Sequence, residues 1–282
     1  MNSSYRFKEN ISAVILCAGE GTRLKKITKS IPKPLIKIEN LNNISILHHL
    51  INILIELEIY QIGIVIGHLG NSIRQFISTL EFNNPSIKDK IMIIDSEEQY
   101  RLGPLYSLLS MTRDKNFFTS RNHYLILPGD TIFEYDLLKE VLAKISDKFH
   151  LIQKHPIVFY RKIGFRALKI LLGINRAISA VETTKLGSDI ILKKINYIKL
   201  EEFTSDKDLK QIIPVTALSY DLINDILKLN QKNLCSSVRE ILNYMVNKGK
   251  KIIVCKIDSQ YSFYDIDYQK DLKNIKKKRK GQ

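Results

Sequence analysis

Short apolar runs alternate with segments of helical periodicity through the first half of the chain. Four runs rich in β-branched residues predict strands at 12–17, 63–66, 90–94 and 123–127. Apolar residues at helical spacing predict helices at 46–57, 72–80, 104–112 and 135–145. Strands that alternate with helices in this way are typical of a parallel sheet with helices on its faces. The first half is therefore predicted to have an α/β fold.

The second half of the chain has a less regular pattern. Strands are predicted at 157–160, 177–182, 190–198 and 251–257. Helices are predicted at 221–229, at 237–247 and, after an extended segment at 261–267, from Gln269 onward. We expect these strands to add a small extra sheet to the central one. No repeat or Gly/Pro/Ser-rich linker interrupts the chain, so residues 1–282 are predicted to form a single domain.

The chain carries an excess of positive charge. Its 282 residues include 44 Lys and Arg against 29 Asp and Glu, which gives a formal net charge of +15. The excess is spread along the chain except for one cluster at 273–280 (KNIKKKRK). Because runs of like charge are usually solvated, we expect this cluster to be an exposed terminus. The alternative is contact with nucleic acid or lipid. No RNA-binding aromatic motif or zinc-finger spacing supports the former, and no nucleic-acid partner is expected.

The rest of the composition excludes several classes of protein. Hydrophobic residues make up 44% of the chain, as in an ordinary folded globule. The cysteines Cys17, Cys235 and Cys255 have neither the spacing of a disulfide framework nor that of a zinc site. Residues 1–10 lack the apolar run of a signal peptide, and the most apolar long stretch, 44–59, is too short and too polar to span a membrane. We therefore expect a soluble cytoplasmic protein without a membrane span.

A glycine-rich loop follows the first predicted strand, at 18–23 (Ala-Gly-Glu-Gly-Thr-Arg). Two glycines let the backbone turn sharply, and the amide groups left unpaired by such a turn can cradle phosphate oxygens. Arg23 adds a planar fork that suits phosphate, and Lys33 adds a point charge on a stiff segment between two prolines. The third glycine of the dinucleotide fingerprint is missing, as is the Gly-Lys-Ser/Thr of the P-loop. A different phosphate-binding loop is therefore predicted.

The complete string of motifs is more specific than its parts. Gly-Glu-Gly-Thr-Arg-Leu at 19–24, then Thr28, then Pro-Lys-Pro-Leu at 32–35, resembles the signature of the sugar-phosphate nucleotidylyltransferases, or NDP-sugar pyrophosphorylases. The resemblance implies their fold: a Rossmann-like, mostly parallel central sheet flanked by helices, with a small extra sheet on the acceptor side. It also implies a nucleotide-binding half at 11–145, an acceptor-binding half at 146–267, and a terminal helix and basic tail at 268–282.

The same resemblance implies which residues bind the two substrates. The nucleotide-binding positions are Ala18, Gly19, Gly21, Thr22, Arg23, Glu98 and Gly103. Glu98 stands where relatives carry Gln, and the adjacent Gln99 could serve if the register shifts by one. Lys33 and Lys194 are the candidates for the acceptor phosphate, although Lys194 is the weaker one, because a lysine at such a position is more often an ordinary surface residue.

Two distant aspartates are candidate metal ligands. Asp130 follows a predicted strand in Leu-Pro-Gly-Asp, where ligands bind in open α/β sheets. Asp265 matches the late aspartate of the family, but Asp267 lies two residues on, and alternation along an extended segment would place both carboxylates on one face, with Ile266 opposite. Mg²⁺ is usually held by one or two carboxylates together with substrate phosphates, so it is the implied cofactor.

The implied reaction joins a nucleoside triphosphate to a sugar 1-phosphate and releases pyrophosphate, with Arg23, Lys33 and Asp130 as catalytic residues. Tyr106-Ser107-Leu108 and Asp265-Ile266-Asp267 also resemble cytidylyltransferases that act on phosphocholine, inositol phosphate or similar phosphoalcohols. A second alternative is a regulatory relative that binds nucleotide sugars without turnover. The sequence leaves the number of subunits open, a homo-oligomer included.

Overall fold

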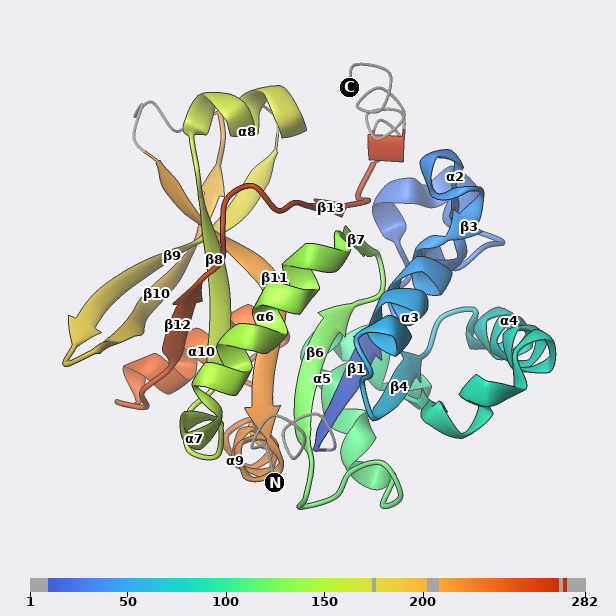
Figure 1. Cartoon of the computed structure of the whole chain (residues 1–282), viewed down its shortest axis with the longest axis horizontal. Coiled ribbons are helices and arrows are strands. Elements are labelled where there is room, and N and C mark those ends of the chain that lie inside the picture. The colour runs from blue at the N-terminus through green and yellow to red at the C-terminus, as the bar shows by residue number, and fades with distance from the viewer. Residues whose placement is uncertain (1–9, 174–175, 202–207, 269–270, 273–282) are drawn as a thin grey trace.

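The computed structural model describes residues 10–173, 176–201, 208–268 and 271–272. The basic cluster at 273–280 and the start of the predicted last helix at Gln269 lie outside the described residues. The largest feature is a nine-stranded sheet with the order β5-β4-β1-β6-β11-β8-β12-β10-β9 (Figure 1). No helix among the described residues is long and apolar enough to cross a membrane.

The first half of the chain forms the parallel part of this sheet. Its strands are β1 (Ile11–Leu16), β4 (Gln61–Ile66), β5 (Ile91–Asp95) and β6 (His123–Pro128). All three pairings between them are parallel, and Val14 of the central strand lies opposite Gly63 on one side and Ile126 on the other. Parallel strands are covered on both faces, which is why they read as continuous apolar runs in the sequence.

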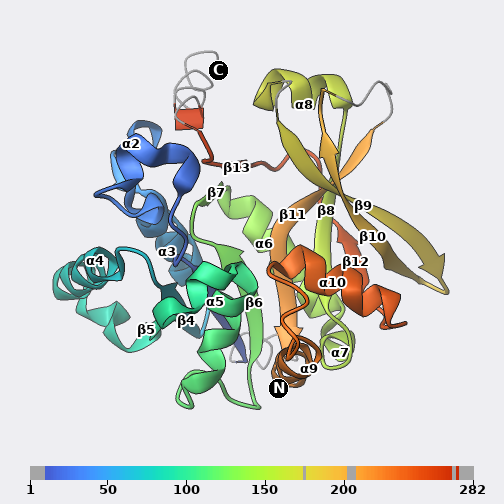
Figure 2. The ribbon, with the colours of Figure 1, turned by 180° about the vertical axis from the view of Figure 1, so that it is seen from behind.

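Helices cover both faces of the sheet. In Figure 1, α3 (Ile46–Glu56) and α6 (Tyr135–Asp147) lie over the face toward the viewer. The reverse view shows α5 (Pro104–Ser110) and α10 (Val238–Asn247) over the other face (Figure 2). The remaining helices of seven residues or more are α4 (Gly70–Asn83), α8 (Phe165–Leu172) and α9 (Tyr220–Leu229).

The core follows this layering. Ala13 and Ile15 of β1 belong to one apolar cluster with buried residues of α3, α4 and α6. Val14 points to the opposite face and joins a second cluster with residues of α5, α9 and α10. Alternation along the strand therefore supplies both layers. At roughly 1.5–3 kcal/mol for each fully buried large aliphatic side chain, these layers are the main source of stability.

The second half continues the same sheet in mostly antiparallel fashion. β11 (Leu209–Ser219) runs antiparallel between β6 and β8 (Ile157–Ile163), β12 (Ile253–Lys256) is parallel to β8, and the long hairpin of β9 (Ala177–Leu186) and β10 (Asp189–Lys199) completes the edge. The predicted α/β fold with a central sheet and flanking helices is confirmed. The extra antiparallel strands are present as well, but they extend the central sheet instead of forming a separate one.

Short elements frame the carboxyl ends of β1 and β6. After β1 come η1 (Thr22–Leu24), α2 (Lys25–Thr28) and η2 (Lys33–Leu35), and after β6 comes β7 (Thr131–Phe133). Near the end of the chain, β13 (Phe263–Asp265) pairs antiparallel with β7 and crosses between the two halves (Figure 1). The other short elements are β2 (Lys37–Ile38), η3 (Glu39–Leu41), β3 (Ile44–Ser45), η4 (Pro85–Lys90), η5 (Glu97–Leu102), η6 (Met111–Arg113) and α7 (Phe149–Ile152).

Candidate active site

The loop after β1 is held in place by its own neighbours. Gly21 has a φ of +61°, a left-handed conformation that glycine adopts without strain. Its carbonyl accepts hydrogen bonds from the Thr28 hydroxyl at 3.0 Å and from the Leu24 amide at 2.9 Å. Thr28 therefore closes the loop, which explains its place in the motif. The loop begins at the carboxyl end of a central parallel strand, where α/β sheets bind ligands.

A cavity of about 270 Å³ opens over this loop. We call it the loop cavity. It is lined by Leu16, Cys17, Ala18, Gly19, Gly21, Lys33, Pro34, Tyr100, Pro104, Ser107, Pro128 and Asp130. Three of the predicted nucleotide-binding residues, Ala18, Gly19 and Gly21, thus lie in its wall. The loop glycines, one ammonium and one carboxylate line the same space, a combination that suits a polyphosphate and its counterions.

The other predicted nucleotide-binding residues lie around this cavity and not in its wall. Thr22 and Arg23 are exposed on η1. Glu98 is exposed on η5, where its carboxylate pairs with Arg101 at 2.7 Å. Gly103, with a φ of +121°, ends η5, and the neighbouring Pro104 reaches the cavity. Tyr100, between Glu98 and Gly103, supplies the aromatic surface of this wall.

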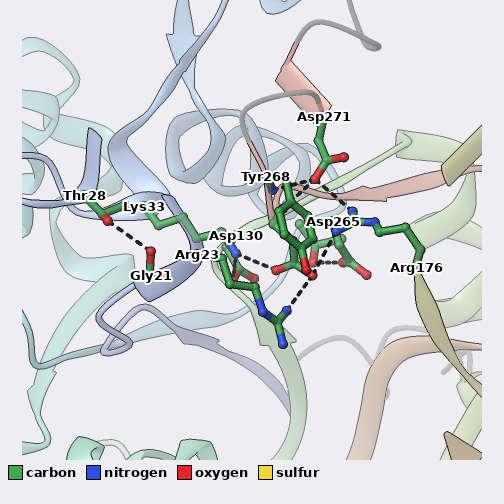
Figure 3. A network of polar contacts seen from close by, with 11 residues as sticks. Gly21, Arg23, Thr28, Lys33, Asp130, Arg176, Asp265, Tyr268 and Asp271 are labelled. Atoms are coloured by element: carbon green, nitrogen blue, oxygen red, sulfur yellow. Dashed lines mark hydrogen bonds and ion pairs between the residues drawn. The ribbon is translucent and has the colours of Figure 1, made fainter. Parts of the chain in front are cut away.

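A chain of opposite charges crosses the floor of the site (Figure 3). Lys33 Nζ lies 2.6 Å from an oxygen of Asp130 and 3.1 Å from an oxygen of Asp267. The other oxygen of Asp267 is 2.9 Å from Nη1 of Arg23. The predicted residues Arg23, Lys33 and Asp130 therefore come together, although they lie up to 107 positions apart (130 − 23) in the sequence.

Burial and neighbouring charges shift the pKa values of Lys33 and Asp267 in opposite directions. Burial alone would lower the pKa of Lys33, but the carboxylates of Asp130 and Asp267 raise it above its ordinary value. For Asp267, partial burial favours the neutral acid, yet the cations around it, first of all Lys33, hold its pKa below the usual range. Both groups are therefore ionised at neutral pH, and each neutralises the other.

Asp265 has a different environment from Asp267. It lies opposite Thr131 in the β13–β7 pair and accepts a hydrogen bond from the Thr131 hydroxyl at 2.5 Å. Protein atoms surround its carboxyl at the base of the site even though water reaches it, and this desolvation, with the charges of Asp130 and Asp267, raises its pKa to about 6. Between the two aspartates, Ile266 is fully buried with Leu24 and Ile132. The predicted alternation along this segment is thus observed.

A second network fixes the segment after β13. The carboxylate of Asp271 accepts hydrogen bonds from the backbone amides of Asp267 and Tyr268, at 2.9 and 2.7 Å. It also pairs with Nη2 of the buried Arg176 at 2.8 Å. Arg176 lies over the Tyr268 ring at 4.6 Å and reaches Asp267 at 3.6 Å (Figure 3). This contact joins the start of β9 to the segment that carries Asp265 and Asp267.

A larger cavity, of about 390 Å³, lies on the second half. We call it the sheet cavity. Its polar and charged lining comprises Arg23, Arg161, Arg176, Ser179, Tyr197, Lys199, Glu201, Gln211, Asp265, Asp267 and Tyr268. Arg23 faces this cavity and not the loop cavity. Lys194 does not line it: that side chain is exposed on β10, beside a β-bulge. Lys199, five residues further along β10, is the lysine that does.

Carboxylate oxygens are the ligands that Mg²⁺ prefers, so the donors here fit that ion chemically. Among the described residues, Asp265, whose pKa is raised, has no cation partner at contact distance, whereas Asp267 is already paired with Lys33 and Arg23. Within the part of the chain that the structure describes, no three His, Cys, Asp or Glu side chains form a ready metal-binding group. A magnesium ion would therefore need substrate oxygens to complete its coordination.

Several residues of these cavities were not predicted from the sequence. Arg176, Gln211 and Arg161 lie in the half where the motifs are weak, and only the register of β8, β9 and β11 brings them together. One feature of the sequence could have identified Asp271: it lies near the start of a predicted helix, where an acidic side chain commonly accepts hydrogen bonds from nearby backbone amides.

The profile of the nucleotidyl transferase family matches residues 12–156 of the chain. The bifunctional protein GlmU of Methanococcus maripaludis (strain C5) is 39% identical over 132 residues, which cover 47% of the chain and 27% of that protein. The chain thus matches little more than a quarter of this relative's length. The profile covers the half that carries the glycine loop and Asp130.

Two solved structures resemble nearly the whole chain. A UDP-glucose pyrophosphorylase in complex with UDP-glucose superposes with a TM-score of 0.68 at 17% identity and covers 97% of this chain and 100% of its own. The CTP:phosphocholine cytidylyltransferase of Streptococcus pneumoniae has a TM-score of 0.62 at 15% identity, with 96% and 99% covered. At these identities the likeness concerns the fold, which extends through both halves.

Proposed function

Because the chain belongs to the nucleotidyl transferase family, we propose that it is a nucleotidyltransferase that joins a nucleoside triphosphate to a sugar 1-phosphate and releases pyrophosphate. The observation that carries this proposal is that Lys33 pairs with Asp130 in the wall of the loop cavity and with Asp267 in the wall of the sheet cavity. Lys33 therefore stands between the loop cavity and the sheet cavity, a position that suits a reaction between two phosphates.

The proposed roles follow from the position of each group. The triphosphate would lie over the amides of Gly19 and Gly21, and Arg23 would leave Asp267 to hold the departing pyrophosphate. The acceptor phosphate would approach from the sheet cavity, and its oxygen would attack the α-phosphorus in line. Lys33, which already bridges two carboxylates, would neutralise the negative charge that builds up between the two reacting phosphates. No covalent enzyme intermediate is required.

Asp130 and Asp265 are the residues that would hold Mg²⁺. When bound, the ion would neutralise negative charge on the phosphate oxygens of the substrates. We favour Asp265 over Asp267 for this role because Asp267 is already neutralised by cations of the protein itself. The predicted halves at 11–145 and 146–267 are part of the same proposal, with one substrate assigned to each.

The proposal is tested by pyrophosphate release in the presence of Mg²⁺. Five nucleoside triphosphates would be combined with glucose 1-phosphate, mannose 1-phosphate, N-acetylglucosamine 1-phosphate, phosphocholine and inositol 1-phosphate. Release that requires one triphosphate and one acceptor together supports the transfer reaction and identifies both substrates. Nucleotide binding by calorimetry without release from any pair would favour the non-catalytic alternative, and the absence of both would refute the interpretation of the glycine loop.

A further inference from the structure

One buried arginine in the wall of the sheet cavity has no role in the proposed transfer. Arg161 lies on β8 and is 2% exposed. Its described partners are the side chain of Gln211, the carbonyl of Tyr261 at 2.9 Å and the ring of Phe263 at 4.7 Å. None of these partners is an anion. Its Nη2 atom is buried and has no hydrogen-bond partner among the described residues.

Arg161 fixes the orientation of the Gln211 amide. The two residues lie opposite each other in the β8–β11 register, and Nε of Arg161 donates to Oε1 of Gln211 at 3.0 Å. A guanidinium nitrogen can only donate, so the oxygen of this amide must face the arginine. The amide nitrogen of Gln211 is then the end left for the cavity that this residue lines. None of the residues that the structure describes accepts a hydrogen bond from this nitrogen.

The cavity wall at this point therefore offers hydrogen-bond donors backed by a positive charge. Desolvation lowers the pKa of Arg161, and Glu134 and Asp265 act on it only from beyond ion-pair distance. Such a wall attracts hydroxyl, carbonyl or carboxylate oxygens. Its charge repels a quaternary ammonium group. Proteins commonly hold such a group on aromatic faces, but the aromatic rings that line this cavity, Tyr197, Phe263 and Tyr268, each already have an arginine over them.

We propose that Gln211, held by Arg161, is a specificity-determining residue for the acceptor and donates a hydrogen bond to an oxygen of its non-phosphate part. Arg161 is the positioning residue, acting through Gln211. The inference rests on the proposed transfer reaction, and it deepens that proposal by favouring a polyhydroxylated phosphate ester over phosphocholine. It assigns the choice of acceptor to the centre of the sheet and not to Lys194.

Steady-state kinetics of three variants test this role, using the triphosphate that supports release and glucose 1-phosphate or inositol 1-phosphate as acceptor. Gln211→Leu removes the donor and is expected to raise the acceptor KM roughly tenfold, with kcat and the KM for the triphosphate nearly unchanged. Arg161→Lys keeps the charge but loses the Nε donor, so it should raise the acceptor KM in the same way. The double variant should be no worse than Gln211→Leu alone, because both changes remove the same contact.

Matched controls are Gln75→Leu on the exposed surface of α4 and Arg121→Lys in the loop before β6, both expected to match the wild type. A further variant, Gln211→Glu, replaces the donor by an acceptor and should raise the turnover of phosphocholine relative to glucose 1-phosphate. An unchanged acceptor KM in Gln211→Leu, or a wild type that prefers phosphocholine, overturns the inference while the transfer reaction stands. A complete absence of turnover with every acceptor overturns both. A lower melting temperature with equal losses for both substrates would mean that the pair only packs β8 against β11.

Discussion

Lys33 links the two cavities, because it lines the loop cavity and pairs with Asp267 of the sheet cavity. Its ammonium group lies between Asp130 and Asp267, and its side chain is only 9% exposed, so the charge is held at one point. The prolines on either side of Lys33 restrict the backbone that carries this side chain, and Pro34 is itself buried in η2. In the absence of substrates, carboxylates occupy the positions that phosphate oxygens would take. Arg23 and Lys33 are therefore already neutralised by Asp130 and Asp267, and substrate anions would have to compete with these two aspartates.

The role of Asp130 can be tested directly. Asp130→Asn removes a negative charge next to Lys33 and a proposed ligand for Mg²⁺, so we expect turnover to fall roughly a thousandfold. The measurement is pyrophosphate release under saturating substrates. Asp136→Asn, on the exposed start of α6, is the matched control and should stay at the wild-type rate. Activity of the Asp130 variant within tenfold of wild type would exclude this role.

The neutralisation of Arg23 and Lys33 by carboxylates leads to a second prediction. Asp267→Asn removes the partner of Arg23 and one partner of Lys33, so both cations become available to an anion. We expect pyrophosphate to bind several-fold more tightly to this variant in the absence of Mg²⁺, since charge-assisted hydrogen bonds to phosphate no longer replace an existing pair. Isothermal calorimetry provides the comparison, and weaker binding than in the wild type would contradict competition by Asp267.

Local spacing explains which site residues could be predicted from the sequence. Arg23, Lys33 and Asp130 lie in motifs where glycine, proline and a strand end fix the backbone, and the structure brings them together. Gln211 and Arg161 meet only through a strand pairing 50 residues apart. Lys194 and Lys199 both lie on β10, and nothing in the local pattern distinguishes the lysine that lines a cavity from the exposed one.

At the scale of elements, the helices and strands of the first half were predicted almost completely. The prediction for the second half lacked one central strand, β11. α3 begins at Ile46 as predicted and ends at Glu56, one residue early. No strand was predicted at the residues of β11 because Pro214 interrupts the apolar pattern, and proline is depleted in central strands. The register shifts between Ile213 and Thr216, so a bulge accommodates the proline in the middle of the sheet. α8 was also missed, since its eight residues are too short for a clear period.

The base of the β9–β10 hairpin has a pH dependence that can be measured. Asp189, at the start of β10, accepts hydrogen bonds from Lys251 at 2.9 Å and from Lys148 at 3.0 Å. The two ammonium groups cover the carboxylate, although few other atoms surround it, and these bonds lower its pKa to about 2. The folded pKa lies below the unfolded one, so this contribution to stability is complete above about pH 4 and is lost as the pH falls toward 2.

We therefore expect Asp189→Asn to lower the melting temperature at pH 5–7 and to make less difference below pH 3. Thermal melts of both proteins across that range would show their curves converging in acid. Asp136→Asn serves again as a control with a constant offset. A difference between wild type and variant that stays constant from pH 2 to 7 would mean that the ion pairs of Asp189 contribute nothing.

At the scale of the whole molecule, the two halves are joined twice. The nine-stranded sheet runs through both, and the segment from β13 to Tyr268 crosses between them above the site (Figure 1). That segment is pinned to the first half through β7 and to the second half through Arg176. The pairing of β13 with β7 holds Asp265 beside Asp130, and Arg176 ties the same segment to the second half.

Because of this arrangement, we expect Asp271, which lines neither cavity, to affect the stability of the whole molecule. Asp271→Asn leaves Arg176 without its main partner, and loss of one member of a buried pair should lower the free energy of unfolding by about 3 kcal/mol. We also expect turnover to fall, because the amides of Asp267 and Tyr268 lose their charged acceptor. Asp225→Asn breaks the exposed pair with Lys250 and should change stability by less than about 1 kcal/mol. Equal denaturation midpoints for the two variants would show that the Arg176–Asp271 pair does not hold the segment.

The position of β11 has a consequence for the order of events during synthesis on the ribosome. β6 ends at Pro128, yet the strand that covers its free edge, β11, begins only at Leu209. A nascent chain that has already formed the four parallel strands therefore displays an unpaired edge while about 80 further residues (209 − 128) are translated. At roughly 5–20 residues per second, that interval lasts several seconds. The first half on its own would present an open sheet edge to other chains, and we expect expression of residues 10–156 alone to yield aggregated protein.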